Sequence, residues 1–276
     1  MEKMKKLFGE VNMSWPKVLI FAVASAIFTA AMLVIDGLKE SSFQDIGIAF
    51  ECWILFAMFI IMNSKKMIEA ISKTFVFFVV SQPLIYLFQV PFSDMGMGLF
   101  GYYKRWAVIT ILTIPGAAIA YLVKKKNIIA AGVLSVANAY LAYMSAKYLR
   151  SAIFDFPHHL LSAIFCFALA VFFCVVFFDE KKLLKRLTVG FVAFVFVVCF
   201  IFTGRSHKVD VRLGKGNWDY TMDKEKIVVV EIDGSKAKIK GKHDGDTIIT
   251  FTNDKGEVIE YQATVGAGNV FMTSIG

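Results

Sequence analysis

Residues 160–178 read LLSAIFCFALAVFFCVVFF and contain no charge, and the next four residues, Asp179-Glu180-Lys181-Lys182, are all charged. A helix needs roughly 20 mainly apolar residues to cross about 30 Å of hydrocarbon. Backbone polar groups inside a bilayer must bond within their own segment, so an apolar run of this length is expected to be helical. The stretch therefore predicts a transmembrane helix.

Similar runs occur along most of the chain, which has 276 residues, 57% of them hydrophobic and only 19% charged. We predict seven transmembrane helices, at Pro16–Ile35, Ile46–Met62, Thr74–Val90, Trp106–Val123, Ile128–Lys147, His158–Phe178 and Leu187–Phe202. The first run is too long for the apolar part of a signal peptide, which is roughly 7–15 residues, so it is interpreted as an uncleaved helix. The predicted fold of this part is a polytopic α-helical membrane bundle.

Basic residues near the helix ends indicate the orientation, because cytoplasmic loops carry an excess of them. One side has Lys3, Lys5, Lys6, Lys17, Lys65, Lys66, Lys73, Lys124, Lys125, Lys126, Lys181, Lys182, Lys185 and Arg186. The other side has Lys39, Lys104, Arg105, Lys147, Arg150, Arg205 and Lys208. This excess predicts a cytoplasmic N-terminus and, after seven crossings, an extracytoplasmic C-terminus. The net charge of +8 is largely cytoplasmic lysine and gives no reason to expect a nucleic-acid partner.

The composition changes after Gly204, where polar and apolar residues begin to alternate as they do in half-buried strands. We expect two domains, residues 1–204 in the membrane and residues 205–276 outside it. The strands expected in the second domain are Lys226–Ile232, Lys236–Lys240, Thr247–Thr252 and Glu257–Val265. Asn253-Asp254-Lys255-Gly256 predicts a hairpin turn between the last two, with glycine available for a positive φ.

Residues 244–256, DGDTIITFTNDKG, together with the closing strand through Val265, resemble the small bacterial immunoglobulin-like domains of surface proteins. The resemblance covers the exported segment and not the membrane part. It implies a small all-β sandwich that serves adhesion, spacing or partner contact and has no catalysis of its own.

Polar side chains in the predicted membrane region need a reason, because they are costly there. Glu51, near the outer leaflet, is interpreted as a member of an ion pair between helices, as a ligand or proton site that opens outward, or as a protonated side chain exposed to lipid. Polar residues at the outer level extend this second interpretation. The candidate ligand-binding residues are Glu51, Gln82, Gln89, Lys104, Arg105, Tyr140, Tyr143, Lys147 and Arg150. The alternative for this set is an interfacial aromatic belt with lysines that reach toward water.

Four other features carry expectations. Pro83 and Pro115 lie mid-way along the third and fourth runs and predict either packing kinks or the broken helices of transporters. Asn138, near mid-membrane, is expected to hydrogen-bond between helices. His158 and His159 begin the predicted sixth helix, where adjacent side chains diverge by about 100°, so we expect interfacial or helix-cap roles and not a shared metal ion.

Three functions stay open at this point. The sequence favours a non-enzymatic, multi-pass protein of the cell membrane that displays an immunoglobulin-like domain for contact with an extracytoplasmic protein or the cell wall, with lipid around its helices. The alternatives are a small-molecule transporter or receptor and a membrane-embedded enzyme that uses Glu51 with a histidine. All four cysteines lie in apolar runs and no phosphate loop, GxSxG or HExxH motif occurs. We therefore expect no metal, cofactor or exported disulfide.

Overall fold

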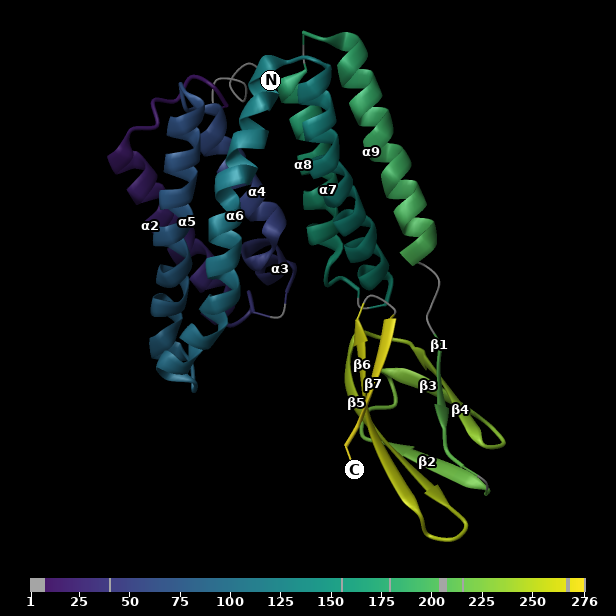
Figure 1. Ribbon diagram of the computed structural model, residues 1–276. Coiled ribbons are helices and arrows are strands. Elements are labelled where there is room, and N and C mark those ends of the chain that lie inside the picture. Colours follow the sequence, from purple (N-terminus) through teal and green to yellow (C-terminus); the bar gives the residue numbers. More distant parts are fainter. Residues whose placement is uncertain are drawn as a thin grey trace. The chain divides into compact units, whose positions relative to one another are not determined.

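The computed structural model describes residues 8–39, 41–154, 156–178, 180–203, 208–214, 216–266 and 269–275. These residues are mostly helical, and a C-terminal region of antiparallel strands forms two sheets (Figure 1). The chain divides into two compact units: Met1–Ala142 with Ile164–Val195, and Tyr143–Ala163 with Phe196–Gly276. The predicted domain boundary at Gly204 and Arg205 lies outside the described residues, as do Lys3, Lys5 and Lys6.

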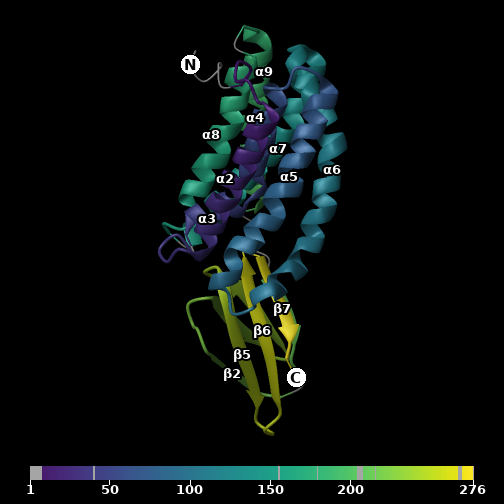
Figure 2. The same ribbon diagram turned by 90° about the vertical axis from the view of Figure 1, so that its left-hand side faces the viewer.

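The described residues form eight α-helices, seen from two directions in Figures 1 and 2. They are α2 (Trp15–Val34), α3 (Ser42–Ile48), α4 (Phe50–Met62), α5 (Met67–Gln89), α6 (Tyr103–Tyr121), α7 (Ile128–Phe154), α8 (Leu160–Phe177) and α9 (Lys182–Thr203). Short 3₁₀ helices η1 (Val90–Phe92), η2 (Gly96–Tyr102) and η3 (Leu122–Lys125) flank α5 and α6. Six spans are long and apolar enough to cross a membrane, or seven if α3 and α4 form one span.

The second predicted run, Ile46–Met62, is not one straight helix. α3 and α4 meet at an angle of 48°, and Ala49 between them has an extended backbone, with φ −69° and ψ 146°. In an unbroken helix the Gly47 carbonyl would accept a hydrogen bond from the amide four residues later. Here the Thr29 hydroxyl of α2 donates to that carbonyl at 3.1 Å. A Cβ on Gly47 would lie 2.8 Å from Met32 Cγ, so the missing side chain lets α3 approach α2 closely.

The first unit packs around aromatic rings. Phe21 of α2 stacks on Phe77 of α5 at 5.1 Å, and Trp53 of α4 meets Phe78 at 5.7 Å. Small buried residues on α2, among them Ala22, allow close approach of the neighbouring backbone. α5 and α6 run through Pro83 and Pro115 as single helices, so the prolines do not produce broken helices.

The hydrogen bond predicted for Asn138 is confirmed. Its Nδ2 in α7 donates to Cys174 Sγ in α8 at 3.0 Å, and both residues are buried. In the second unit the Ser145 hydroxyl donates to the Ala163 carbonyl at 2.8 Å, which joins the C-terminal part of α7 to the start of α8. Polar side chains inside this apolar region are thus used to link helices.

We call residues 208–275 the β region. Its strands are β1 (Lys208–Arg212), β2 (Trp218–Met222), β3 (Val228–Asp233), β4 (Lys236–Gly241), β5 (Gly245–Asn253), β6 (Val258–Gly266) and β7 (Asn269–Ser274). One sheet has the order β1-β4-β3 and the other the order β2-β5-β6-β7, and every pairing is antiparallel. The four predicted strands are present, whereas β1, β2 and β7 were not assigned individually from the sequence.

The inner faces of both sheets share one core. Ile249 and Phe251 of β5 are fully buried on the same face, as the alternation predicted, and they pack with Ile239 of the other sheet. The predicted hairpin turn is also confirmed. Gly256 has φ +81°, and Asn253 Oδ1 accepts hydrogen bonds from the two backbone amides that flank this glycine, at 2.9 and 2.8 Å.

Candidate functional site

A cavity of about 470 Å³ lies among α2, α3, α4, α5, η2 and α6 of the first unit. We call it the polar cavity. Its polar lining comes from Thr29, Gln82, Tyr86, Gln89, Tyr102 and Arg105, and its aromatic walls include Trp53 and Trp106. Aromatic walls with a few convergent polar groups are typical of small-molecule sites.

The two glutamines lie on one face of α5, because seven residues make nearly two helical turns. Gln82 is 2% exposed, and its Nε2 has no hydrogen-bond partner among the described residues. Gln89 Nε2 instead donates to the Ile85 carbonyl at 2.9 Å. A buried amide donor that lacks a partner has lost its hydrogen bonds to water without replacing them. A ligand with an acceptor could therefore bind the Gln82 side-chain amide in this cavity.

Arg105 supplies the positive charge of the polar cavity. It lies in the first turn of α6 and is exposed, so it stands where the cavity meets its surroundings. A guanidinium presents a planar fork of donors that matches a carboxylate or phosphate. The cavity thus combines an amide donor at depth with a cation near its edge.

The other predicted site residues lie elsewhere. Glu51 is 1% exposed in the first turn of α4, where the positive end of the helix dipole favours a carboxylate, but it does not line the polar cavity. Lys104 is exposed and does not line it either. The Tyr140 ring meets Phe50 edge to face at 5.9 Å.

The last three predicted site residues, Tyr143, Lys147 and Arg150, belong to the second compact unit. There the Arg150 guanidinium lies over the ring of Phe200 at 5.0 Å. The structure therefore gathers Gln82, Gln89 and Arg105 around one cavity and leaves the other six candidates outside it.

Sequence reasoning missed the aromatic walls of the polar cavity. Tyr86 follows Gln82 by four residues and precedes Gln89 by three, so the three share a helix face. This spacing could have predicted from the sequence that Tyr86 lies beside the two glutamines. Trp53 and Trp106 carried no such signal, because they reach the cavity from other helices.

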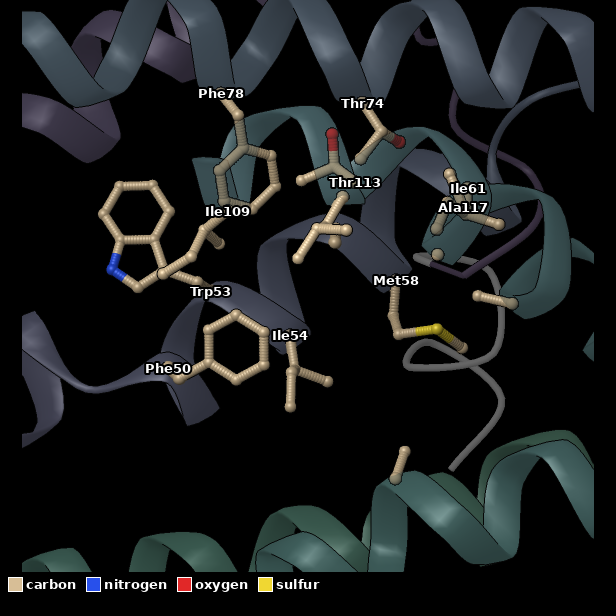
Figure 3. A pocket seen from close by; sticks show the side chains of 15 residues that line it. Phe50, Trp53, Ile54, Met58, Ile61, Thr74, Phe78, Ile109, Thr113 and Ala117 are labelled. Carbon is tan, nitrogen blue, oxygen red and sulfur yellow. The ribbon is translucent and has the colours of Figure 1, made fainter. Parts of the chain in front are cut away.

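A second cavity, of about 460 Å³, lies among α4, α5, α6 and α7 (Figure 3). We call it the apolar cavity. Its walls are almost entirely hydrocarbon, with Phe50, Ile54 and Met58 of α4 on one side, and its lining includes the residues Thr74 and Thr113. Trp53 lines both cavities, so one residue of α4 forms a wall of each.

The predicted divergence of the His158 and His159 side chains was wrong. α8 begins at Leu160, and His159 has a left-handed backbone with φ +66°, so helical geometry does not apply to the pair. The two rings do not diverge but stack, with centroids 3.7 Å apart and 16° between their planes. His159 also stacks on Tyr148 at 6.0 Å, and its Nε2 lies 4.0 Å from Asp244 Oδ2.

Comparisons with known proteins found no matching family model, no similar curated protein and no similar solved structure. The functional inference therefore depends on the residues of the chain itself.

Proposed function

We propose that this chain is a multi-pass protein of the cell membrane that displays its β region outside the cell, for contact with a protein or the cell wall. Six or seven helices of spanning length support the membrane location. The excess of lysine at one set of helix ends supports a cytoplasmic N-terminus and, with seven crossings, an exported β region.

The observation that carries the proposal is that the β region has a core of its own. The buried cluster runs from Val211 to Val270 and draws only on residues of this region. A module with its own core keeps its shape while its surface contacts a partner. Two antiparallel sheets around one core support the likeness to bacterial immunoglobulin-like domains in architecture. The strand order differs from that of antibody constant domains, so we propose a likeness of architecture.

The outer face of the four-stranded sheet is the proposed contact surface. Phe271 of β7 is 64% exposed and Ile248 of β5 is 42% exposed. Phe271 pairs with Thr264, and Ile248 pairs with Gln262, so both apolar side chains lie on the same sheet face. Exposed apolar and aromatic side chains among polar neighbours are typical of contact surfaces.

A photo-crosslinking amino acid placed in the full-length chain, in intact cells, tests this function. We expect position 271 and position 248 to give the same covalent partner, a protein or a cell-wall fragment. Glu231, exposed on β3 of the other sheet, is the matched control and should not give that partner. Absence of a shared adduct at positions 248 and 271, or an equal adduct at 231, would contradict the proposed surface.

The polar cavity favours a second candidate function, a receptor or transporter for a small molecule. Gln82 would donate a hydrogen bond to an acceptor of the small molecule, and Arg105 would bind its anionic group. Trp53 and Trp106 would contact a flat apolar part of the same molecule. A panel of small aromatic carboxylates, benzoate among them, should raise the melting temperature of the wild-type protein but not that of Arg105→Gln. An equal response of both proteins would remove this candidate.

The enzyme alternative stays a prediction. It pairs Glu51 with His158 or His159, and Glu51 belongs to the first compact unit whereas both histidines belong to the second.

A further inference from the structure

The apolar cavity is bounded by matching faces of two helices. On α4 the lining residues are Phe50, Trp53, Ile54, Ala57, Met58 and Ile61, and on α6 they are Ile109, Leu112, Thr113, Gly116, Ala117 and Ala120. Both sets have the spacing i, i+3, i+4, i+7, i+8 and i+11, which describes one continuous helix face. Such faces normally interlock. Here small residues, among them Ala57 and Gly116, leave space between them.

The shape of this space fits a chain better than a compact ligand. Eleven residues along either helix correspond to about 16 Å, so about 460 Å³ is spread over three helical turns. Leu112 and Phe50 line the cavity and are 59% and 41% exposed, so the cavity opens at an apolar surface. Neighbouring residues of α6, such as Val108 and Ile111, are also largely exposed. In a membrane this surface meets hydrocarbon, and apolar walls exclude water.

One polar group marks an end of the cavity. Thr74 of α5 is 1% exposed, and its hydroxyl has no hydrogen-bond partner among the described residues. Thr113, in contrast, donates to the Thr110 carbonyl at 2.6 Å. Thr74 lies one helical turn after Ala70 on α5, and Ala70 packs with Ile61 and Ala117, so Thr74 belongs to the part of the cavity that these residues line (Figure 3). A bound chain that carries an oxygen at this end would accept a hydrogen bond from Thr74.

The same end of the cavity is basic. α4 ends at Met62, and the exposed Lys65 and Lys66 follow it. η3 continues α6 and ends at the exposed Lys125. Basic pockets between helices on the cytoplasmic side bind anionic lipid head groups.

From these four observations we infer that the apolar cavity binds one acyl chain of an anionic phospholipid. The chain lies between α4 and α6, an ester oxygen accepts a hydrogen bond from Thr74, and the head group lies near Lys65, Lys66 and Lys125. The inference rests on the proposed membrane location, which sedimentation of the full chain with membranes tests separately.

Native mass spectrometry of the full-length protein, loaded with phosphatidylglycerol in a mild detergent and then stripped stepwise, tests the inference. We expect one lipid to remain on the wild-type protein. A Cβ on Gly116 meets nothing within 4 Å and Gly116 lines the cavity, so Gly116→Leu should occupy part of it and abolish this retention. Gly132 on α7 also has open space around a Cβ and does not line the cavity, so Gly132→Leu is the matched control.

Two further variants separate the parts of the site. Thr74→Val keeps the size of the side chain and should weaken retention on the order of fivefold, the effect of one hydrogen bond. The double variant Lys65→Gln, Lys125→Gln should remove a preference for phosphatidylglycerol over phosphatidylcholine. Retention by Gly116→Leu equal to that of Gly132→Leu would overturn the inference, and equal retention of both lipids by the wild type would overturn its anionic part.

Discussion

Replacing Gln82 by methionine should stabilise the protein while it weakens small-molecule binding. Gln82 is 2% exposed, and its Nε2 has no hydrogen-bond partner among the described residues. An unsatisfied buried polar group costs about 1–3 kcal/mol. Methionine has nearly the same volume and is flexible, so the packing around position 82 should survive the change. We therefore expect the free energy of unfolding to rise by about 1–3 kcal/mol.

Thermal denaturation of the detergent-solubilised full chain measures this effect. At about 2–4 °C per kcal/mol, the melting temperature should rise by roughly 2–12 °C. Gln89→Met is the matched control, since it makes the same change on the same helix face of the polar cavity. Gln89 Nε2 already donates to the Ile85 carbonyl, so its loss should lower stability by at most about 1 kcal/mol. If Gln82→Met destabilises the protein as much as Gln89→Met, the amide is satisfied in the native state and the reasoning fails.

Two further predictions concern the β region. The Asp223 carboxylate accepts a hydrogen bond from the Thr247 hydroxyl at 2.6 Å and one from the Ile248 amide at 2.7 Å. Both hydrogen bonds lower the pKa of Asp223. Because the folded pKa lies below the unfolded value of about 3.9, the carboxylate stabilises the fold above that value, and the stabilisation is lost as pH falls through the folded pKa. Hydrogen exchange at Ile248 should therefore show reduced protection in strong acid for the wild type, with a smaller pH dependence in Asp223→Asn. Separately, a Cβ on Gly241 would lie 2.7 Å from Val265 Cγ1. Gly241→Ala should therefore lower the free energy of unfolding, measured by chemical denaturation, by about 1–3 kcal/mol. Gly266→Ala, where a Cβ meets nothing within 4 Å, should be close to neutral, and equal losses in both variants would argue against crowding at Gly241.

The helices could be predicted because apolar runs of about 20 residues, the length that a bilayer requires, show directly in the sequence. Residues 160–178 carry no charge and correspond closely to α8. The break at Ala49 was not predictable in this way. No proline marks it, and the Gly47 carbonyl is satisfied by Thr29 of another helix. The stacking of His158 and His159 was missed for a similar reason, since a left-handed backbone at a histidine leaves no periodic signal.

In the β region, Ile249 and Phe251 were placed correctly because alternation alone assigns residues to faces. The strands β1, β2 and β7 take their pairing from the tertiary structure. Of the candidate site, the polar residues of α5 and Arg105 could be named from sequence because a charge or amide in a membrane region is unusual. The cavities themselves depend on how α4 and α6 pack, and no pattern in either helix alone reveals the space between them.

Labelling with a membrane-impermeant maleimide tests the central claim, that the helices carry the β region across the membrane. Single cysteines replace Lys255, exposed in the turn after β5, or Lys125, exposed at the end of η3, in a full-length chain whose native cysteines are replaced. The account predicts that Lys255→Cys reacts in intact cells and that Lys125→Cys reacts only after lysis. Labelling of Lys125→Cys in intact cells, with protection of Lys255→Cys, would contradict it.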